Sequence, residues 1–260
     1  MGSDRIRAAE ATQVLLPASF EPPPGVDLHA RYHSVRCGGD YFDASVVGSR
    51  TAFLLTDIAG RRAAAHRIAA VVQEVFRNHA HDLFRAPDAN ESQAITTLVQ
   101  EVNSTLMALG GELHSSPTFV GCYNAPLGIL TFISAGCHPP LFRDSVGTRT
   151  LEGGGVPLGL FTHLTHEPAV QVFEPGAKML LVTKGVVESG RGRTEFGMDR
   201  IKCLLENSNL PSAADICQMV LDSSHEFRTR GSSAVRAVLR LGKSANHDDL
   251  TAVALVRPTV

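Results

Sequence analysis

Two long segments with helical periodicity interrupt a series of short apolar segments, and this alternation most limits the folds that the chain can adopt. Residues 63–84 and 92–109 place Ala, Val, Ile and Leu at helical spacing. Two further helical segments, 199–207 and 212–227, follow later in the chain. Short apolar segments bounded by Gly and Pro predict strands at 28–35, 45–56, 118–123, 128–135, 141–144, 169–172, 179–182 and 252–256. We therefore predict an α+β layered fold of mostly antiparallel sheets with helices packed outside.

Composition indicates a well-buried core and excludes several classes of protein. The 260 residues are 43% hydrophobic and 19% charged, with a net charge of −2, so the chain has no overall attraction to nucleic acid or acidic membranes. The five cysteines are scattered and form no CxxC pair, which argues against a disulfide framework and a zinc site and favours a reducing compartment. We find no membrane span and no secretory leader, and expect a cytoplasmic protein with no nucleic-acid partner and no membrane partner.

The N-terminal residues differ in pattern from the rest. Residues 1–16 show weak helical periodicity, and Pro17 followed by three prolines at 22–24 forms a stiff connector. We expect the remnant of a linker helix at 1–16 and a single domain at 17–260.

Four short segments that lie far apart in the chain carry most of the chemical information. They are GGDYFD at 38–43, TDIAG at 56–60, TKGVVES at 183–189 and DDLT at 248–251. Three contain aspartates next to predicted strands, and carboxylates gathered from distant strand ends are a common way to bind Mg²⁺ or Mn²⁺. A lone strand-end aspartate is more often a turn former or a helix cap, and the pair at 248–249 also fits an exposed turn.

The order of these segments resembles that of the metal-dependent serine/threonine protein phosphatases, the protein phosphatase 2C (PPM) family, in its bacterial SpoIIE/RsbU branch. The resemblance extends from about residue 15 to residue 256. It rests on the four segments above and on LLP at 15–17, SAGCHPP at 134–140, GGGVPLGL at 153–160 and EFG at 195–197. It implies a four-layer αββα sandwich, in which two mostly antiparallel sheets are flanked by helices.

The resemblance also implies a metal site at one end of the sandwich. One or two Mn²⁺ or Mg²⁺ ions would activate a water that attacks the phosphate of phosphoserine or phosphothreonine. By position, Asp57 resembles the bridging ligand and the Ile58 carbonyl a main-chain ligand, while Asp40 would hold the second ion and Asp248 the first. The residues expected in the second shell or in contact with phosphate are Asp249, Asp43, Arg61 and Arg62.

Three departures from the family pattern bear on activity. Gly60 is followed by Arg61 and Arg62 rather than by His and Gly, and Cys137 stands where the family has His, with His138 one place along. The largest change is Lys184, which replaces the aspartate that ligates the first ion. A protonated lysine has no acceptor and repels a cation, although it could occupy the place of the ion and pair with carboxylates.

Two functions follow from Lys184. In the first, Asp40 and Asp57 act catalytically with a bound ion, and Lys184 supplies positive charge near the phosphate of a protein substrate. In the second, the chain is a pseudophosphatase that binds a phosphoprotein or signalling partner without catalysis. The family branch suggests a STAS-type anti-sigma-factor antagonist as the phosphorylated partner in either case.

Overall fold

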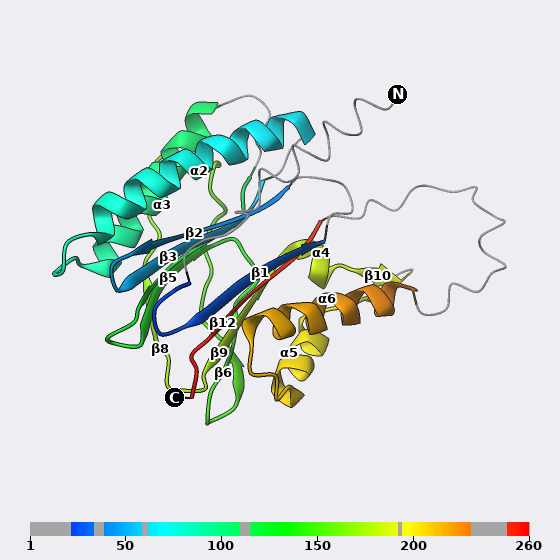
Figure 1. Cartoon of the computed structure of the whole chain (residues 1–260). Coiled ribbons are helices and arrows are strands. Elements are labelled where there is room, and N and C mark those ends of the chain that lie inside the picture. The colour runs from blue at the N-terminus through cyan, green and yellow to red at the C-terminus, as the bar shows by residue number, and fades with distance from the viewer. Residues whose placement is uncertain are drawn as a thin grey trace, which may run out of the picture.

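A computed structural model describes residues 22–33, 39–58, 62–109, 115–191, 194–229 and 249–259 of the chain. Within these ranges, two five-stranded antiparallel sheets lie face to face and helices cover both outer faces (Figure 1). The predicted four-layer αββα sandwich is confirmed. The expected linker helix at 1–16 lies outside the described residues.

The first sheet, here called sheet I, contains the strands on either side of the long helical pair. Its order is β2 (Asp40–Val47), β3 (Arg50–Asp57), β4 (Thr118–Asn124), β5 (Ile129–Ala135) and β8 (Ala169–Val172). The helices that cover it are α2 (Arg62–Phe84) and α3 (Glu91–Leu109).

The second sheet, sheet II, joins the two ends of the chain. Its order is β1 (Asp27–His33), β12 (Leu250–Val256), β9 (Lys178–Val182), β6 (Leu141–Arg143) and β7 (Thr148–Thr150). Its outer face is covered by α5 (Met198–Asn207) and α6 (Ala213–Thr229). The smaller elements near them are α4 (Lys184–Val187) and the hairpin of β10 (Gly190–Arg191) and β11 (Thr194–Glu195).

Three apolar clusters fill the spaces between the four layers. One lies between sheet I and helices α2 and α3, the second between the two sheets, and the third between sheet II and helices α5 and α6. Successive side chains of a strand point to opposite faces, so neighbouring residues enter different clusters. On β9, Leu181 faces the other sheet and Leu180 faces the helices. This alternation decides which polar residues at the strand ends meet.

The segment 45–56, which we expected to be a single strand, is a hairpin. Strands β2 and β3 pair along their whole length and are joined by a turn at Gly48, whose φ of +60° is unfavourable for other residues. The apolar residues continue on both sides of this two-residue turn, so composition alone hides it. Strand β2 consequently includes residues 40–43, which we expected to form a loop.

Among the described helices, none combines the length and hydrophobicity needed to cross a bilayer.

Candidate functional site

Asp40 and Asp57 lie directly opposite each other at one end of the β2–β3 hairpin. They are paired in register, Asp40 as the first residue of β2 and Asp57 as the last residue of β3. Residues paired in this way have Cβ atoms about 5 Å apart, and like charges at that separation repel. Phe42 and Leu55, two residues away on each strand, belong to the cluster between the sheets, so both carboxylates face sheet II.

Two threonines of sheet II bind the Asp40 carboxylate. Thr183 Oγ1 donates to Asp40 Oδ2 at 2.7 Å, and Thr251 Oγ1 donates to the same oxygen at 2.6 Å. Thr183 directly follows β9, and Thr251 is the second residue of β12. Asp40, a residue of sheet I, is therefore attached to the ends of β12 and β9, two adjacent strands of sheet II.

The surroundings of Asp40 disfavour its negative charge. Burial raises the pKa of Asp40 well above its usual range, and the neighbouring charge of Asp57 raises it further. The Thr251 and Thr183 hydroxyls oppose this change, and the Asp249 carboxylate adds to it. A cation beside these carboxylates would favour their charged forms.

Gly39 brings several oxygen atoms close together. A Cβ atom at position 39 would lie 3.1 Å from Asp57 Oδ1 and 3.4 Å from the Ile58 carbonyl oxygen, so both oxygens border the space that glycine leaves open. The Gly39 amide donates to Asp249 Oδ2 at 3.1 Å. Carboxylate and carbonyl oxygens are the ligands that Mg²⁺ and Mn²⁺ prefer, so the donor set fits such an ion.

A cavity of about 250 Å³ opens beside Asp57. Its lining includes Lys184, Glu188 and His138, which bring charged or ionisable groups to the same space. Lys184 Nζ lies 3.6 Å from Glu188 Oε1, one helical turn along α4. The cavity is therefore lined by Asp57, whose carboxylate faces that of Asp40, and by the Lys184–Glu188 ion pair.

The ion-substitute role expected for Lys184 does not agree with its position. We expected the ammonium to pair with Asp57 and Asp248, but its ion pair is with Glu188 and 54% of its side chain is exposed. Lys184 begins helix α4, and a long flexible side chain at that position reaches solvent with little loss of hydration.

Cys137 and His138 line the same cavity although they are neighbours in sequence, which in a strand would place them on opposite faces. The segment is not a strand, so the strand alternation does not apply. Burial raises the pKa of Cys137 to about 12, and the Asp57 and Asp40 charges add to the effect. At neutral pH, Cys137 is a thiol rather than a nucleophilic thiolate.

Asp43 lies on the opposite face of β2 from Asp40 and does not reach the cavity. Its carboxylate accepts hydrogen bonds from Arg77 Nε at 2.7 Å, Arg77 Nη2 at 3.0 Å and the Tyr41 hydroxyl at 2.9 Å. Because it is three residues from Asp40 along a strand, Asp43 faces helix α2. This position does not agree with the expected second-shell or phosphate-binding role, and Asp43 instead joins α2 to sheet I through Arg77.

The remaining predicted residues are only partly described. Asp248 and Arg61 lie outside the described residues, and of Arg62 the structure gives only its place at the start of α2. Within the described ranges, no group of three or more His, Cys, Asp or Glu side chains has the geometry to hold a metal ion. The site as described therefore consists of Asp40, Asp57 and the Ile58 carbonyl, with Asp249 beside them.

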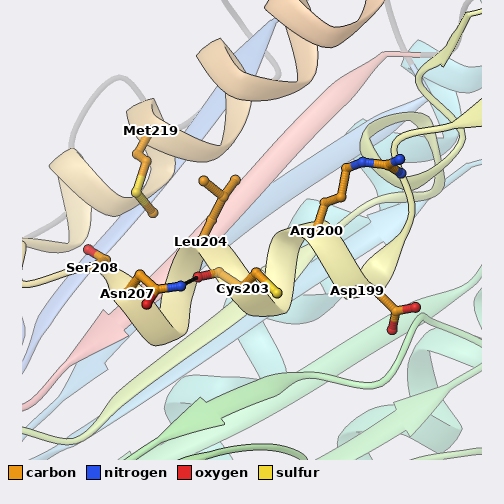
Figure 2. A pocket seen from close by; sticks show the side chains of 7 residues that line it. All are labelled: Asp199, Arg200, Cys203, Leu204, Asn207, Ser208 and Met219. Atoms are coloured by element: carbon orange, nitrogen blue, oxygen red, sulfur yellow. Dashed lines mark hydrogen bonds between the residues drawn. The ribbon is translucent and has the colours of Figure 1, made fainter.

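A second cavity, larger at about 720 Å³, lies over α5 and the facing side of α6 (Figure 2). Arg200 is at one end of it, and Asn207 and Met219 are at the other. Arg200 donates to the Phe196 carbonyl at 2.7 Å, and Asn207 Nδ2 donates to the Cys203 carbonyl at 2.8 Å. These polar groups are already bonded to main chain, so size alone does not make this cavity the functional site.

Sequence reasoning missed Thr183, Thr251 and Glu188 as members of the site. All three belong to the motifs TKGVVES and DDLT. Strand alternation could have identified the two threonines. Thr183 and Thr251 lie two residues from the apolar Leu181 and Val253 and therefore face the space between the sheets as those residues do.

Comparisons with known proteins agree with this fold. The family model described as "Stage II sporulation protein E (SpoIIE)" matches residues 48–258. The RsbU and RsbW domains of Rv1364c from Mycobacterium tuberculosis are 22% identical to the chain with a TM-score of 0.68, over 94% of this chain and 63% of that one. The PP2C phosphatase domain of Bacillus subtilis SpoIIE, with a fragment of its regulatory domain, is 16% identical with a TM-score of 0.67, over 92% and 64%. The chain thus spans slightly less than two thirds of both structures.

The SiaA-PP2C domain of Pseudomonas aeruginosa matches over nearly its whole length. It is 13% identical with a TM-score of 0.73, over 98% of each chain. Two other similar structures hold divalent cations: the catalytic domain of PstP is in complex with two manganese ions, and RsbX is in complex with magnesium. The fold is that of PP2C phosphatase domains. Because the family model covers most of the chain, the chain belongs to the SpoIIE family.

Proposed function

We propose that this chain hydrolyses phosphoserine or phosphothreonine in a regulatory protein, using Mn²⁺ or Mg²⁺. The observation that carries the proposal is the pairing in register of two carboxyl groups, Asp40 and Asp57, of which Asp57 lines a cavity. A protein gains no stability from opposing carboxylates, so this arrangement fits a site that binds a cation.

Several residues of this chain would hold the ion. Asp57, Asp40 and the Ile58 carbonyl would provide oxygen ligands, and Asp248 would add another from the segment that precedes Asp249. Asp249 would orient its neighbours through its bond with the Gly39 amide. The chemistry that Mn²⁺ or Mg²⁺ supplies in such sites is activation of water and neutralisation of phosphoryl charge.

Lys184 would bind the substrate rather than the metal. Its half-exposed side chain lines the cavity beside Asp57, and an ammonium there attracts the phosphate of a protein substrate. Arg61 and Arg62, which lie between Asp57 and the body of α2 in the sequence, would add guanidinium groups that suit phosphate oxygens.

A second function is favoured by one observation. Lys184 stands where the family pattern has a ligand aspartate, and a lysine cannot ligate a cation. In this alternative the chain is a pseudophosphatase, whose cavity binds a phosphoprotein without hydrolysing it.

The same similarity suggests the partner and the extent of the domain. One structural neighbour contains RsbU and RsbW domains, and another comes from the bacterial stressosome. We infer a phosphorylated regulatory protein, of the STAS-type anti-sigma-factor antagonist class, as the substrate. The phosphatase domain would extend over 17–260, which contains the family match, with a linker remnant at 1–16.

Hydrolysis of a phosphoserine peptide and a phosphothreonine peptide across a Mn²⁺ series tests the proposal. We expect slow hydrolysis that Mn²⁺ stimulates, complete loss in Asp57→Asn, and no loss in Asp222→Asn, a control at an exposed position on α6. Lys184→Asp should raise Mn²⁺ affinity about tenfold or more because it adds an oxygen ligand beside Asp57. Phosphopeptide binding without any Asp57-dependent hydrolysis would instead establish the pseudophosphatase.

A further inference from the structure

Thr183 occupies a helix N-cap without capping the helix. It directly precedes α4 and has the extended backbone of an N-cap, with φ −80° and ψ 164°, yet its side chain makes no capping hydrogen bond. Threonine at this position usually accepts a bond from an amide of the first turn, which stabilises the helix. Here the hydroxyl is directed to Asp40 instead.

The hydrogen bonds around Thr183 fix the direction of its proton. The Thr251 amide donates to Thr183 Oγ1 at 3.1 Å, so that oxygen acts as an acceptor on one side. Its own proton is then directed to Asp40 Oδ2 at 2.7 Å. The main chains of the two threonines are also joined, because the Thr183 amide donates to the Thr251 carbonyl at 3.0 Å. The two hydroxyls thus form one preorganised donor pair.

We propose that Thr183 and Thr251 are positioning residues for the metal site, which hold Asp40 Oδ2 so that the other carboxylate oxygen is presented toward Asp57. This inference rests on the proposed function and deepens it. Both hydrogen bonds that Asp40 makes fall on Oδ2. A ligand carboxylate held by hydroxyl donors on one oxygen has a fixed orientation, and such supporting bonds commonly change metal affinity by about 10–100-fold.

Thr183 and Thr251, here called the clamp, also affect how the two sheets are held together at the site. Asp40 belongs to sheet I, whereas Thr183 and Thr251 belong to the ends of adjacent strands of sheet II. The clamp therefore sets the distance between the two sheets at the site. The same strand end carries Lys184, the next residue after Thr183, so the clamp also fixes where the cavity-lining lysine begins.

A buried threonine pair elsewhere provides the matched control. Thr56 and Thr118 join β3 to β4 through their hydroxyls at 2.8 Å, on the face of sheet I that is turned to α2 and α3. Like the clamp, they are buried and hydrogen-bonded, but they have no bond with Asp40. Replacing Thr118 by valine therefore measures the cost of losing a buried hydroxyl without touching the site.

The experiment is calorimetric titration of the full chain with Mn²⁺ alone, together with thermal unfolding in metal-free buffer. We expect Thr183→Val and Thr251→Val each to weaken Mn²⁺ binding by about 10–100-fold, and Thr183→Ser to retain wild-type affinity because it keeps the hydroxyl. Thr118→Val should lower the melting temperature and leave the Mn²⁺ affinity unchanged.

Three results would overturn the clamp. Wild-type affinity in both folded valine variants would show that the hydroxyls are only structural, while leaving the proposed function intact. Equal weakening in Thr118→Val would show that any buried hydroxyl has the same effect. Failure of the wild type itself to bind Mn²⁺ would remove both the clamp and the metal-dependent function. If a valine variant fails to fold, the Mn²⁺ affinity of Thr183→Ser is measured in its place. An affinity below that of the wild type would contradict the clamp, because serine keeps the hydroxyl.

Discussion

The two ends of strand β3 differ in the partners of their charged side chains. At its first residue, Arg50 Nε contacts Glu91 Oε1 at 2.7 Å, and the guanidinium also donates to the Ala86 and Pro87 carbonyls, each at 2.9 Å. Glu91 accepts a further bond from Asn124 at 2.6 Å. At its last residue, Asp57 faces Asp40, whose hydrogen bonds come from neutral hydroxyls.

The difference separates a structural end from a functional end of the same strand. Around Arg50 the charges are compensated within the chain, and burial of such a network stabilises one arrangement of the loop before α3. Around Asp57 two carboxylates face each other beside a cavity, which is the kind of local conflict expected where a protein binds a ligand. Changes at the two ends should therefore have different effects on stability and on Mn²⁺ response.

The largest expected effect is at the structural end. Arg50→Met removes a guanidinium whose side chain is only 9% exposed and leaves Glu91 without its partner, so we expect a loss of about 3–5 kcal/mol in the free energy of unfolding. Urea denaturation measures it. The control is Arg149→Met, which breaks the surface pair with Asp144 and should cost less than about 1 kcal/mol. Equal losses in the two variants would contradict the comparison.

Mn²⁺ should act only at the functional end. At about 100 times its Kd, Mn²⁺ should add about 2.7 kcal/mol to the free energy of unfolding of the wild type. Arg149→Met should keep this increment, and Asp57→Asn should lose it. The measurement is urea denaturation with and without Mn²⁺, and an increment retained in Asp57→Asn would place the ion elsewhere.

The pH dependence should reveal the strain at Asp40. Its pKa in the folded chain lies above that in the unfolded chain, so the folded state binds more protons between the two values. The contribution of Asp40 to the stability of the metal-free chain should therefore decrease as pH rises through that window. Asp40→Asn should lack this decline and gain up to about 1 kcal/mol at neutral pH, because one of two opposed charges is gone. Parallel pH profiles of wild type and variant would argue against strain.

The smallest expected effect is at Lys184. If Lys184 paired with carboxylates in the place of an ion, Lys184→Met would destabilise the metal-free chain by leaving those carboxylates uncompensated. The exposed pairing with Glu188 instead predicts a change within about 0.5 kcal/mol, since exposed ion pairs of this spacing contribute little. Thermal unfolding in metal-free buffer checks it, and a large loss would restore the ion-substitute role.

The layered fold could be predicted because its signal is local. The spacing of apolar residues and the Gly or Pro breaks between them predict α2, α3, α5, α6 and most strands. The order of the motifs, through the family resemblance, predicts the four layers. The turn at Gly48 was missed because both strands around it are buried on two faces and therefore lack polar alternation. Strand β7 and helix α4, with three and four residues, are too short for a periodic pattern.

The site could be predicted only in part, because side-chain direction depends on register. The sequence indicated Asp40 and Asp57, but placed Asp43 in the same site since nothing in the motif shows that β2 already begins at Asp40. The clamp by Thr183 and Thr251 depends on how the two sheets meet, at separations of 143 and 211 residues from Asp40. No local pattern encodes such contacts.

The most direct test of a metal-binding end of β3 is anomalous diffraction at the manganese edge, from crystals of the full chain grown with Mn²⁺. We expect a peak within bonding distance of Asp57 and Asp40, and a second peak if Lys184→Asp restores the other ion. Absence of any peak beside Asp57 at saturating Mn²⁺, in wild type and in Lys184→Asp, would contradict it.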